Sequence, residues 1–226
     1  MLYGYMGKLL FVDLSNGTYE IRELTEELAR NFIGGYGIGA KILYDEMPAH
    51  TDVFAPESMI GFLSGPMSAS RAFFGGRYMV VSKSPVTGMW NDANSGGYFG
   101  AKLRHSGFDG VFVKGISEKP VYLYLNDGKV EIRDASHLWG KRTIETETLL
   151  RAEVGNDMNA AIIGPAGERM SYMACVMNDE HRAAGRGGSG AVMGSKKLKA
   201  VVVRGSQEVP IFDKERLVAL NRQVAE

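Results

Sequence analysis

The chain has 226 residues, of which 45% are apolar and 23% charged, and its 26 basic residues balance its 26 acidic ones. This composition suits a globular protein with a sizeable core, and the zero net charge argues against a general nucleic-acid or anionic-membrane surface. The single cysteine, Cys175, excludes an internal disulfide and supplies too few thiolates for a zinc or iron–sulfur site. Because no apolar run reaches the ~18 residues of a membrane span and no signal peptide opens the chain, we expect a cytoplasmic protein.

The first half of the chain predicts short strands and helices separated by glycine-rich turns. Lys8–Leu14 and Thr18–Arg22 are typical of a β-hairpin, with Asn16-Gly17 in a type I′ turn. Thr25 is a candidate N-cap for a helix that ends near Phe32. The further elements expected here are a helix over Gly39–Met47, strands over Ser58–Ser64 and Tyr78–Ser82, and a helix over Tyr98–His105.

The second half continues with a strand over Gly110–Gly115 and a second clear hairpin. That hairpin pairs Val121–Leu125 with Lys129–Arg133. The further elements expected are an amphipathic helix over Thr143–Val154, strands over Asn159–Ile163, Ser171–Met177 and Leu198–Arg204, and a helix from Asp213 onward. We therefore expect one domain over residues 1–208, with residues 209–226 beginning a linker or helix that leads to a further domain.

The order of these elements favours an α+β fold, because hairpins are mixed with occasional helices instead of alternating strictly with them. Gly-Pro follows an apolar strand twice, at Gly65-Pro66 and at Gly164-Pro165. Each copy is followed by a short strand and a segment rich in glycine and arginine, which indicates an internal duplication of a β-rich unit.

Three glycine-rich segments are the candidates for binding chemistry: Gly75–Arg77, Asn94–Gly97 and Arg182–Gly188. Each offers backbone amides in conformations that glycine adopts easily, and the first and last add arginine, whose planar donors suit phosphate oxygens. The side-chain oxygen of Asn94 can ligate a hard cation such as magnesium. Since no P-loop or dinucleotide-binding pattern is present, ordinary nucleotide folds are disfavoured. Composition alone leaves Arg182–Gly188 open between an anion-binding loop and a plain tight turn.

The motifs of the chain resemble the N-terminal domain of the aldehyde:ferredoxin oxidoreductase family of tungsten or molybdenum enzymes. The resemblance extends in order over nearly the whole chain, through Met6–Lys8, Gly75–Tyr78, Ala93–Gly100, Ile132–Gly140, Ile163–Glu168 and His181–Lys196. It implies a duplicated β-rich domain with two mainly antiparallel sheets flanked by helices. A tungsten or molybdenum bis-pyranopterin would lie on this base, with magnesium bridging its phosphates.

By motif match, the resemblance also assigns roles to single residues. Arg77 and Arg182 would contact the pterin phosphates, and the Asn94 side chain and the Ala183 carbonyl would help to hold the magnesium. The same cradle would be lined by Gly96, Gly185 and Arg186. No catalytic residue is assigned, because four cysteines in later domains hold the family's 4Fe-4S cluster and the acid and base groups also lie outside these residues.

The implied reaction is oxidation of a small aldehyde to a carboxylate, with electrons passing through the cluster to ferredoxin. The other partners expected are the remaining domains of the same protein, with a homodimer left open and neither nucleic acid nor membrane. Two alternatives also stay open: a benzoyl-CoA reductase-type member with the same cofactor cradle, and a stand-alone cofactor-binding scaffold subunit. We expect residues 1–226 alone to be inactive.

Several other residues have ordinary structural interpretations. Trp90, Phe73 and Phe74 are expected in the core, and Glu145 and Glu147 on a solvated helix face. The four histidines lack metal-ligand spacing, which argues against a role in catalysis or metal binding.

Overall fold

The first of two sheets forms from the N-terminal half of the chain. The computed structural model describes residues 2–225. The strands of this sheet are β1 (Lys8–Asp13), β2 (Thr18–Glu23), β3 (Ile60–Ser64), β4 (Tyr78–Lys83), β5 (Trp90–Ser95) and β6 (Gly110–Lys114). They lie in the order β2-β1-β6-β3-β4-β5, and each neighbouring pair is antiparallel except β1 and β6.

The second sheet forms from the C-terminal half. Its strands are β7 (Val121–Asn126), β8 (Lys129–Asp134), β9 (Asn159–Ile162), β10 (Val176–Asn178), β11 (Arg182–Ala184) and β12 (Leu198–Arg204). They lie in the order β11-β10-β9-β12-β7-β8, and the one parallel pair is β12 with β7.

The two sheets have the same topology. If β7–β12 are matched with β1–β6 in chain order, every neighbour and every strand direction agrees, including the single parallel pair. Gly65-Pro66 follows β3 and Gly164-Pro165 follows its counterpart β9. The prediction of a duplicated α+β domain with two mainly antiparallel sheets is therefore confirmed.

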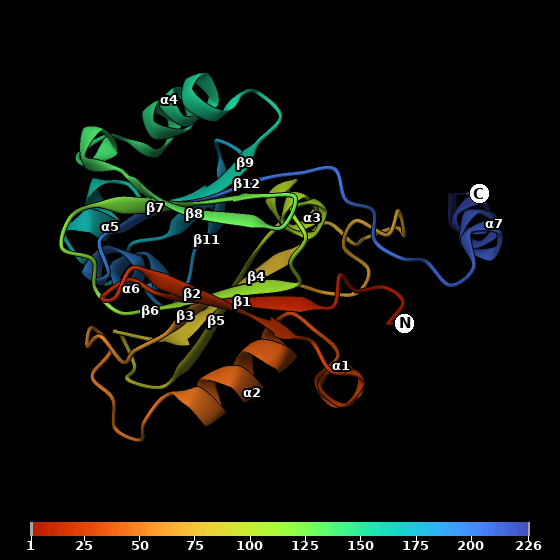
Figure 1. The fold of residues 1–226 in the computed structure, drawn as a ribbon, viewed down its shortest axis with the longest axis horizontal. Helices are drawn as coiled ribbons and strands as arrows, with labels where there is room; N and C mark the ends of the chain where they lie inside the picture. Colours follow the sequence, from red (N-terminus) through yellow and green to blue (C-terminus); the bar gives the residue numbers. More distant parts are fainter. Residues whose placement is uncertain (1, 226) are drawn as a thin grey trace.

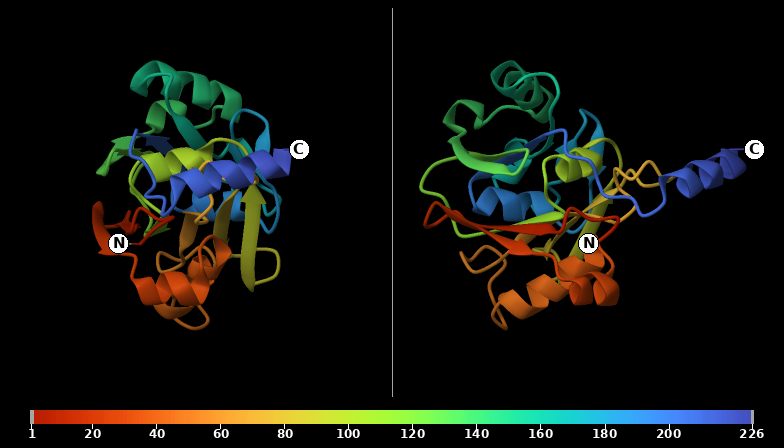
Figure 2. Two further views of the ribbon diagram at one scale, coloured as in Figure 1. Left: turned by 90° about the vertical axis from the view of Figure 1, so that its right-hand side faces the viewer. Right: turned by 45° about the vertical axis from the view of Figure 1, so that its right-hand side comes forward.

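Helices lie outside both sheets and also between them (Figure 1). The helices are α1 (Glu26–Phe32), α2 (Tyr36–Glu46), α3 (Phe99–His105), α4 (Thr143–Val154), α5 (Pro165–Glu168), α6 (Ser189–Ser195) and α7 (Lys214–Ala225), with a 3-10 turn at Ser136–Leu138. In Figure 1, α2 lies below the first sheet and α4 above the second, with α3 and α6 between. α7 extends away from this body and buries no side chain (Figure 2). No helix in residues 2–225 is long and apolar enough to cross a membrane.

Alternation along the strands creates the apolar layers. In β1, Leu10 and Val12 face the core between the sheets, together with Phe99 of α3 and Val192 of α6. Leu9 and its neighbours on the opposite face pack against α1 and α2. A third cluster lies between the second sheet and α4. Both sheets are thus covered on both faces, which explains why so many of their strands read as continuous apolar runs.

Local differences from the predictions have physical reasons. Residues 171–175 are not a strand, and the strand starts only at Val176. The first hairpin has a four-residue loop instead of a type I′ turn, because the Asp13 carboxylate accepts the amide of Ser15 and the side chain of Asn16. The glycine-rich segment Arg182–Gly188 is not a single loop, since Arg182–Ala184 form β11 and Gly188 is the N-cap residue of α6.

Charged side chains are buried in the fold, and most of them are paired. Arg104 meets Asp109, and Lys199 meets Glu168. Lys196, after α6, is fully buried, and its Nζ has no hydrogen-bond partner among residues 2–225. Burial lowers the pKa of this amine from 10.5 to about 8, against the smaller opposite effect of the Glu57 and Asp13 carboxylates.

We expect Lys196→Met to raise the free energy of unfolding at pH 7 by about 1–3 kcal/mol, because the folded protein must otherwise keep a buried charged amine without a hydrogen-bond partner in residues 2–225. Since folding lowers the pKa of Lys196 from 10.5 to about 8, this cost is fully present below pH 8 and disappears as the pH rises toward 10.5. Urea unfolding of both proteins between pH 7 and about 10.5 checks this. The stability difference should shrink over that range, and a constant difference would contradict it. Lys129→Met, at an exposed lysine, is the control.

Candidate functional site

The two sheets meet at one edge of each. β5 and β11 are edge strands of their sheets, and they contact each other. β5 continues through Gly96-Gly97 into α3, and its counterpart β11 continues through 185–188 into α6. Asn94 and Ala183 occupy equivalent places, each the last residue but one of its strand. The duplication therefore brings two corresponding strand-to-helix turns together.

Arg77 and Asn94 meet on the first-sheet side of this junction. Asn94 pairs with Met79 across β4 and β5, which places its side chain near the residue that precedes β4. The Arg77 guanidinium donates a hydrogen bond to Asn94 Oδ1. Arg77 also borders a cavity of about 370 Å³ that Ile33 and Phe74 help to line.

Arg182 reaches the junction from the second sheet. A Cβ at Gly96 would lie 3.1 Å from Arg182 Nη1, and one at Gly97 would lie 2.8 Å from Arg182 Cδ. Gly97 has a φ of +108°, a conformation that side chains disfavour. Glycine at these positions therefore lets the arginine lie directly over the backbone of the turn. Arg77, Asn94, Gly96 and Arg182 form one group of residues, called the cradle below.

The charge of the cradle is unbalanced. Arg77 and Arg182 are exposed, and neither takes part in an ion pair within residues 2–225. Unpaired guanidinium groups suit phosphate oxygens, which they bind bidentately. The Asn94 amide oxygen is a hard ligand of the kind that magnesium prefers. These donors fit an anionic group that carries phosphates and a divalent cation.

The three other predicted site residues, Ala183, Gly185 and Arg186, make fewer contacts with the cradle residues. Ala183 is exposed and follows Arg182 directly in β11. Gly185 lies near it, since a Cβ built there would be 3.8 Å from the Ala183 methyl and from Cys175 Sγ. Arg186 is exposed and makes no hydrogen bond or ion pair through its side chain with any residue in the described range 2–225. The roles of these three residues, like those of the four cradle residues, stay predictions.

Behind the cradle lies a polar network that the sequence analysis missed. Asn178 of β10 is only 1% exposed. Its Oδ1 accepts hydrogen bonds from Ser95 Oγ at 2.7 Å and from Tyr78 Oη at 3.2 Å, and its Nδ2 donates to the Gly96 carbonyl at 2.9 Å. Burial, and to a lesser degree the nearby Asp179 carboxylate, raise the pKa of the Tyr78 hydroxyl, so it remains a neutral donor.

The turn signal Asn178-Asp179, directly after an apolar run, could have marked the end of β10. Nothing local could have shown what Asn178 binds, because Ser95 is 83 residues away. The expectation of a solvated Glu147 is also wrong, since this carboxylate is buried and accepts the amide of Glu180 in the same turn.

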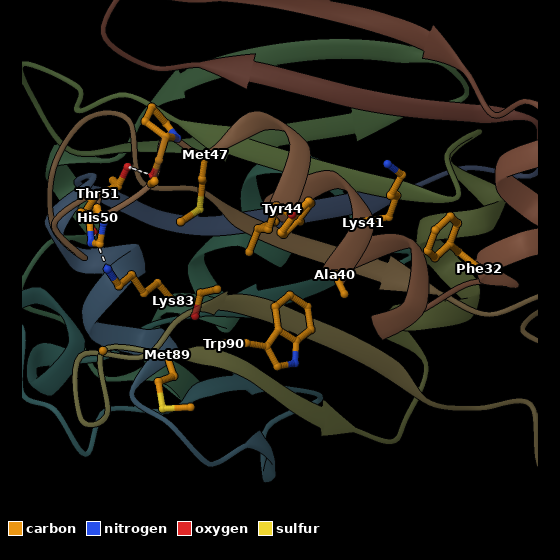
Figure 3. Close-up of a pocket in the computed structure, with 15 residues that line it drawn as sticks. Phe32, Ala40, Lys41, Tyr44, Met47, His50, Thr51, Lys83, Met89 and Trp90 are labelled. Carbon is orange, nitrogen blue, oxygen red and sulfur yellow. Dashed lines mark hydrogen bonds between the residues drawn. The ribbon is translucent and has the colours of Figure 1, made fainter.

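A separate apolar groove lies at the other end of β5. It has a volume of about 930 Å³ and contains none of the predicted site residues. Figure 3 shows Met89 and Trp90 on one side of the groove and Tyr44 on the other. Trp90 is 42% exposed, Phe73 43% and Phe74 90%, so the expectation that these three residues pack in the core is wrong. In residues 2–225, no group of three or more His, Cys, Asp or Glu side chains is arranged to hold a metal ion.

The chain is similar to named enzymes over its whole length. It is 49% identical over 98% of its residues to the tungsten-containing aldehyde ferredoxin oxidoreductase of Pyrococcus furiosus. It is 51% identical, again over 98%, to the protein of that name from Thermococcus kodakarensis. The chain spans 37% of the length of each of these relatives.

A solved structure and a family model agree with this similarity. A chain of the active-site complex BamBC of benzoyl coenzyme A reductase, with 1,5 dienoyl-CoA, superposes with a TM-score of 0.97. It is 38% identical over all of this chain, which corresponds to 34% of that chain. The model of the N-terminal domain of aldehyde ferredoxin oxidoreductase matches residues 9–205. The protein described here therefore belongs to the aldehyde ferredoxin oxidoreductase N-terminal domain family.

Proposed function

We propose that this chain is the cofactor-binding part of an aldehyde:ferredoxin oxidoreductase-type enzyme that oxidises small aldehydes to carboxylates. The observation that carries the proposal is the cradle. Its two exposed arginines, which form no ion pair within residues 2–225, come from different halves of the domain and lie beside a glycine turn and an amide oxygen. The proposal is also supported by the comparisons, since the chain is 49% and 51% identical to two enzymes named tungsten-containing aldehyde ferredoxin oxidoreductase.

In this proposal the residues of the chain bind and orient a tungsten bis-pyranopterin, with molybdenum as the other candidate metal. Arg77 and Arg182 would hold its phosphates, and the Asn94 side chain and the Ala183 carbonyl would be ligands for magnesium. Gly96, Gly185 and Arg186 complete the same surface. The metal and its dithiolenes supply the two-electron redox chemistry when bound. The chain would contribute donors held by two sheets, which would orient the group with little reorganisation.

The remaining parts of the proposed enzyme lie outside these residues. Domains after the one proposed for residues 1–208 would carry the 4Fe-4S cluster, and residues 209–226 would lead toward them. Ferredoxin would accept the electrons, and the protein would work in the cytoplasm. A homodimer is compatible with the proposal but is not required by it.

A benzoyl-CoA reductase-type activity is the second candidate, and one observation favours it. The superposition with the benzoyl coenzyme A reductase chain includes all of this chain at a TM-score of 0.97. In this second candidate, the same cradle would hold the cofactor, and residues elsewhere in the full-length protein would select the substrate.

A panel of aldehydes tested with full-length protein and an oxidised viologen acceptor separates the two candidates. We expect viologen reduction with aldehydes, together with tungsten in the purified protein. Reduction of an aromatic acyl-CoA ring by a low-potential donor, without aldehyde oxidation, would instead support the second candidate. Absence of both tungsten and molybdenum from folded protein would contradict both.

Arg182→Ala in the full-length protein is expected to lower the retention of tungsten and pterin by roughly 10–100-fold, because one charge-assisted contact contributes about 1.5–3 kcal/mol. Metal analysis and pterin fluorescence after extensive dialysis measure this. Arg169→Ala, at an exposed arginine on α5's C-terminal side, is the matched control and should retain both. Unchanged tungsten in the Arg182 variant would refute the assigned role.

Asn94→Ala is expected to lower the ratio of magnesium to tungsten several-fold, because the amide oxygen is lost from the proposed magnesium ligands. Asn94→Asp keeps an oxygen at the same place and should restore the ratio. Elemental analysis of the purified proteins measures both metals. Equal ratios of magnesium to tungsten in the unaltered protein and both variants would exclude Asn94 as a magnesium ligand. Loss of tungsten with an unchanged ratio would show that Asn94 acts only through its hydrogen bond with Arg77.

A further inference from the structure

Arg182 stands directly after a strained turn. Asp179 and Glu180, between β10 and β11, have φ angles of +47° and +63°, which are unusual for residues other than glycine. The turn returns the chain so that Arg182 pairs with Asn178, and the His181 amide bonds to the Asp179 carbonyl at 2.7 Å. The conformation of this turn therefore decides where the Arg182 side chain begins.

The Asp179 carboxylate connects the turn to both halves of the domain. Its Oδ2 accepts hydrogen bonds from the Tyr98 amide at 2.6 Å and from Asn178 Nδ2 at 2.8 Å. Its Oδ1 accepts one from Asn159 Nδ2 at 2.5 Å. The Tyr98 amide belongs to the first half of the domain, directly after Gly96-Gly97, and Asn159 belongs to β9 of the second half.

The same carboxylate lies against the glycine turn on which Arg182 rests. A Cβ at Gly97 would lie 2.0 Å from Asp179 Oδ2 and 2.8 Å from Arg182 Cδ. The carboxylate, the glycine backbone and the aliphatic part of the arginine are therefore packed together. Tyr98 Oη is not involved, since this side chain is 75% exposed and only the backbone amide binds Asp179.

We propose that Asp179 is a positioning residue for cofactor binding, which fixes the guanidinium of Arg182 over Gly96 by tying the β10–β11 turn to the Gly96-Gly97 turn. This inference rests on the proposed function of the cradle and extends it to a residue that lies against the cradle without being one of its members. Without the carboxylate, the Tyr98 amide and the Asn159 side-chain amide lose their acceptor, and the Asn178 side-chain amide keeps only the Gly96 carbonyl. The direct link between Asp179 and the residue that follows the Gly96-Gly97 turn is then lost.

Asp179→Gly tests this in the full-length protein, because it removes the carboxylate while glycine still accepts the φ of +47°. We expect the rate of tungsten and pterin loss during dialysis to rise about tenfold, corresponding to about 1.4 kcal/mol. Asp179→Asn keeps one oxygen acceptor and tolerates the same conformation, so it should restore most of the retention.

Asp127→Gly is the matched control. Asp127 has a φ of +49°, lies in the β7–β8 turn of the same sheet, and accepts the Ser206 amide at 2.8 Å. β8 is at the opposite edge of the sheet from β11. We expect Asp127→Gly, which also removes a hydrogen-bond acceptor from a turn with positive φ, to leave the rate of cofactor loss unchanged. Equal rates in the two variants would reduce Asp179 to a general stabilising role and overturn the proposal.

A double-mutant cycle with Arg182→Ala shows whether Asp179 acts through the arginine. In the Arg182→Ala background, Asp179→Gly should change the rate of cofactor loss by less than twofold, because the group that it positions is gone. Independent, multiplying effects of the two substitutions would overturn the proposal.

The same variants separate a failure of this inference from a failure of the proposed function. If Arg182→Ala alone leaves cofactor retention unchanged, the proposed function of the cradle fails. If Arg182→Ala lowers retention and Asp179→Gly does not, only the role of Asp179 fails. If Asp179→Gly does not fold, the cycle is run with Asp179→Asn. We then expect a smaller increase in the rate of cofactor loss, which again disappears in the Arg182→Ala background.

Discussion

The side-chain amide of Asn178 is the interaction on which the geometry of the cradle depends. It is buried at the place where the edges of the two sheets meet, and it binds β4 through Tyr78, β5 through Ser95 and the following turn through the Gly96 carbonyl. A buried amide is costly unless its donors and acceptors are paired, and here both ends are paired across the junction. The network therefore favours one relative position of β5 and β10, and with it one position of the residues that they carry.

The duplication explains why the cradle has two similar sides. Each strand-to-helix turn is held by a side chain from the other half of the domain. The Gly96-Gly97 turn lies against Asn178 and Arg182, whereas Gly187 lies so close to Asn91 that a Cβ there would be 1.7 Å from its Oδ1. Asn91 also donates to Ser189 Oγ at 2.9 Å. Because each half supports the turn of the other, the two sheets must be folded together before the cradle exists.

Charged residues are divided between two uses in this protein. Arg104 and Lys199 are buried with carboxylate partners, which is how a fold tolerates charge in its interior. The arginines of the cradle are exposed and lack carboxylate partners within residues 2–225, so their donors remain available to an anion. The Asp179 carboxylate belongs to neither set. It accepts hydrogen bonds from amides of both halves of the domain, and it lies beside the aliphatic part of the Arg182 side chain.

The sequence by itself determined the elements that depend on local patterns. The helix capped by Thr25, the hairpin closed by Asp127-Gly128 and the repeated Gly-Pro after a strand follow from turn chemistry and capping, which act within a few residues. Motif resemblance also led to Arg77, Asn94, Gly96 and Arg182, which the structure brings together. Only the tertiary structure decided what joins them. Asn178 and Ser95 are 83 residues apart, and the exposed Trp90 reads locally as a core residue. Contacts between sheet edges depend on how the two halves pack, and no periodicity within either half encodes that packing.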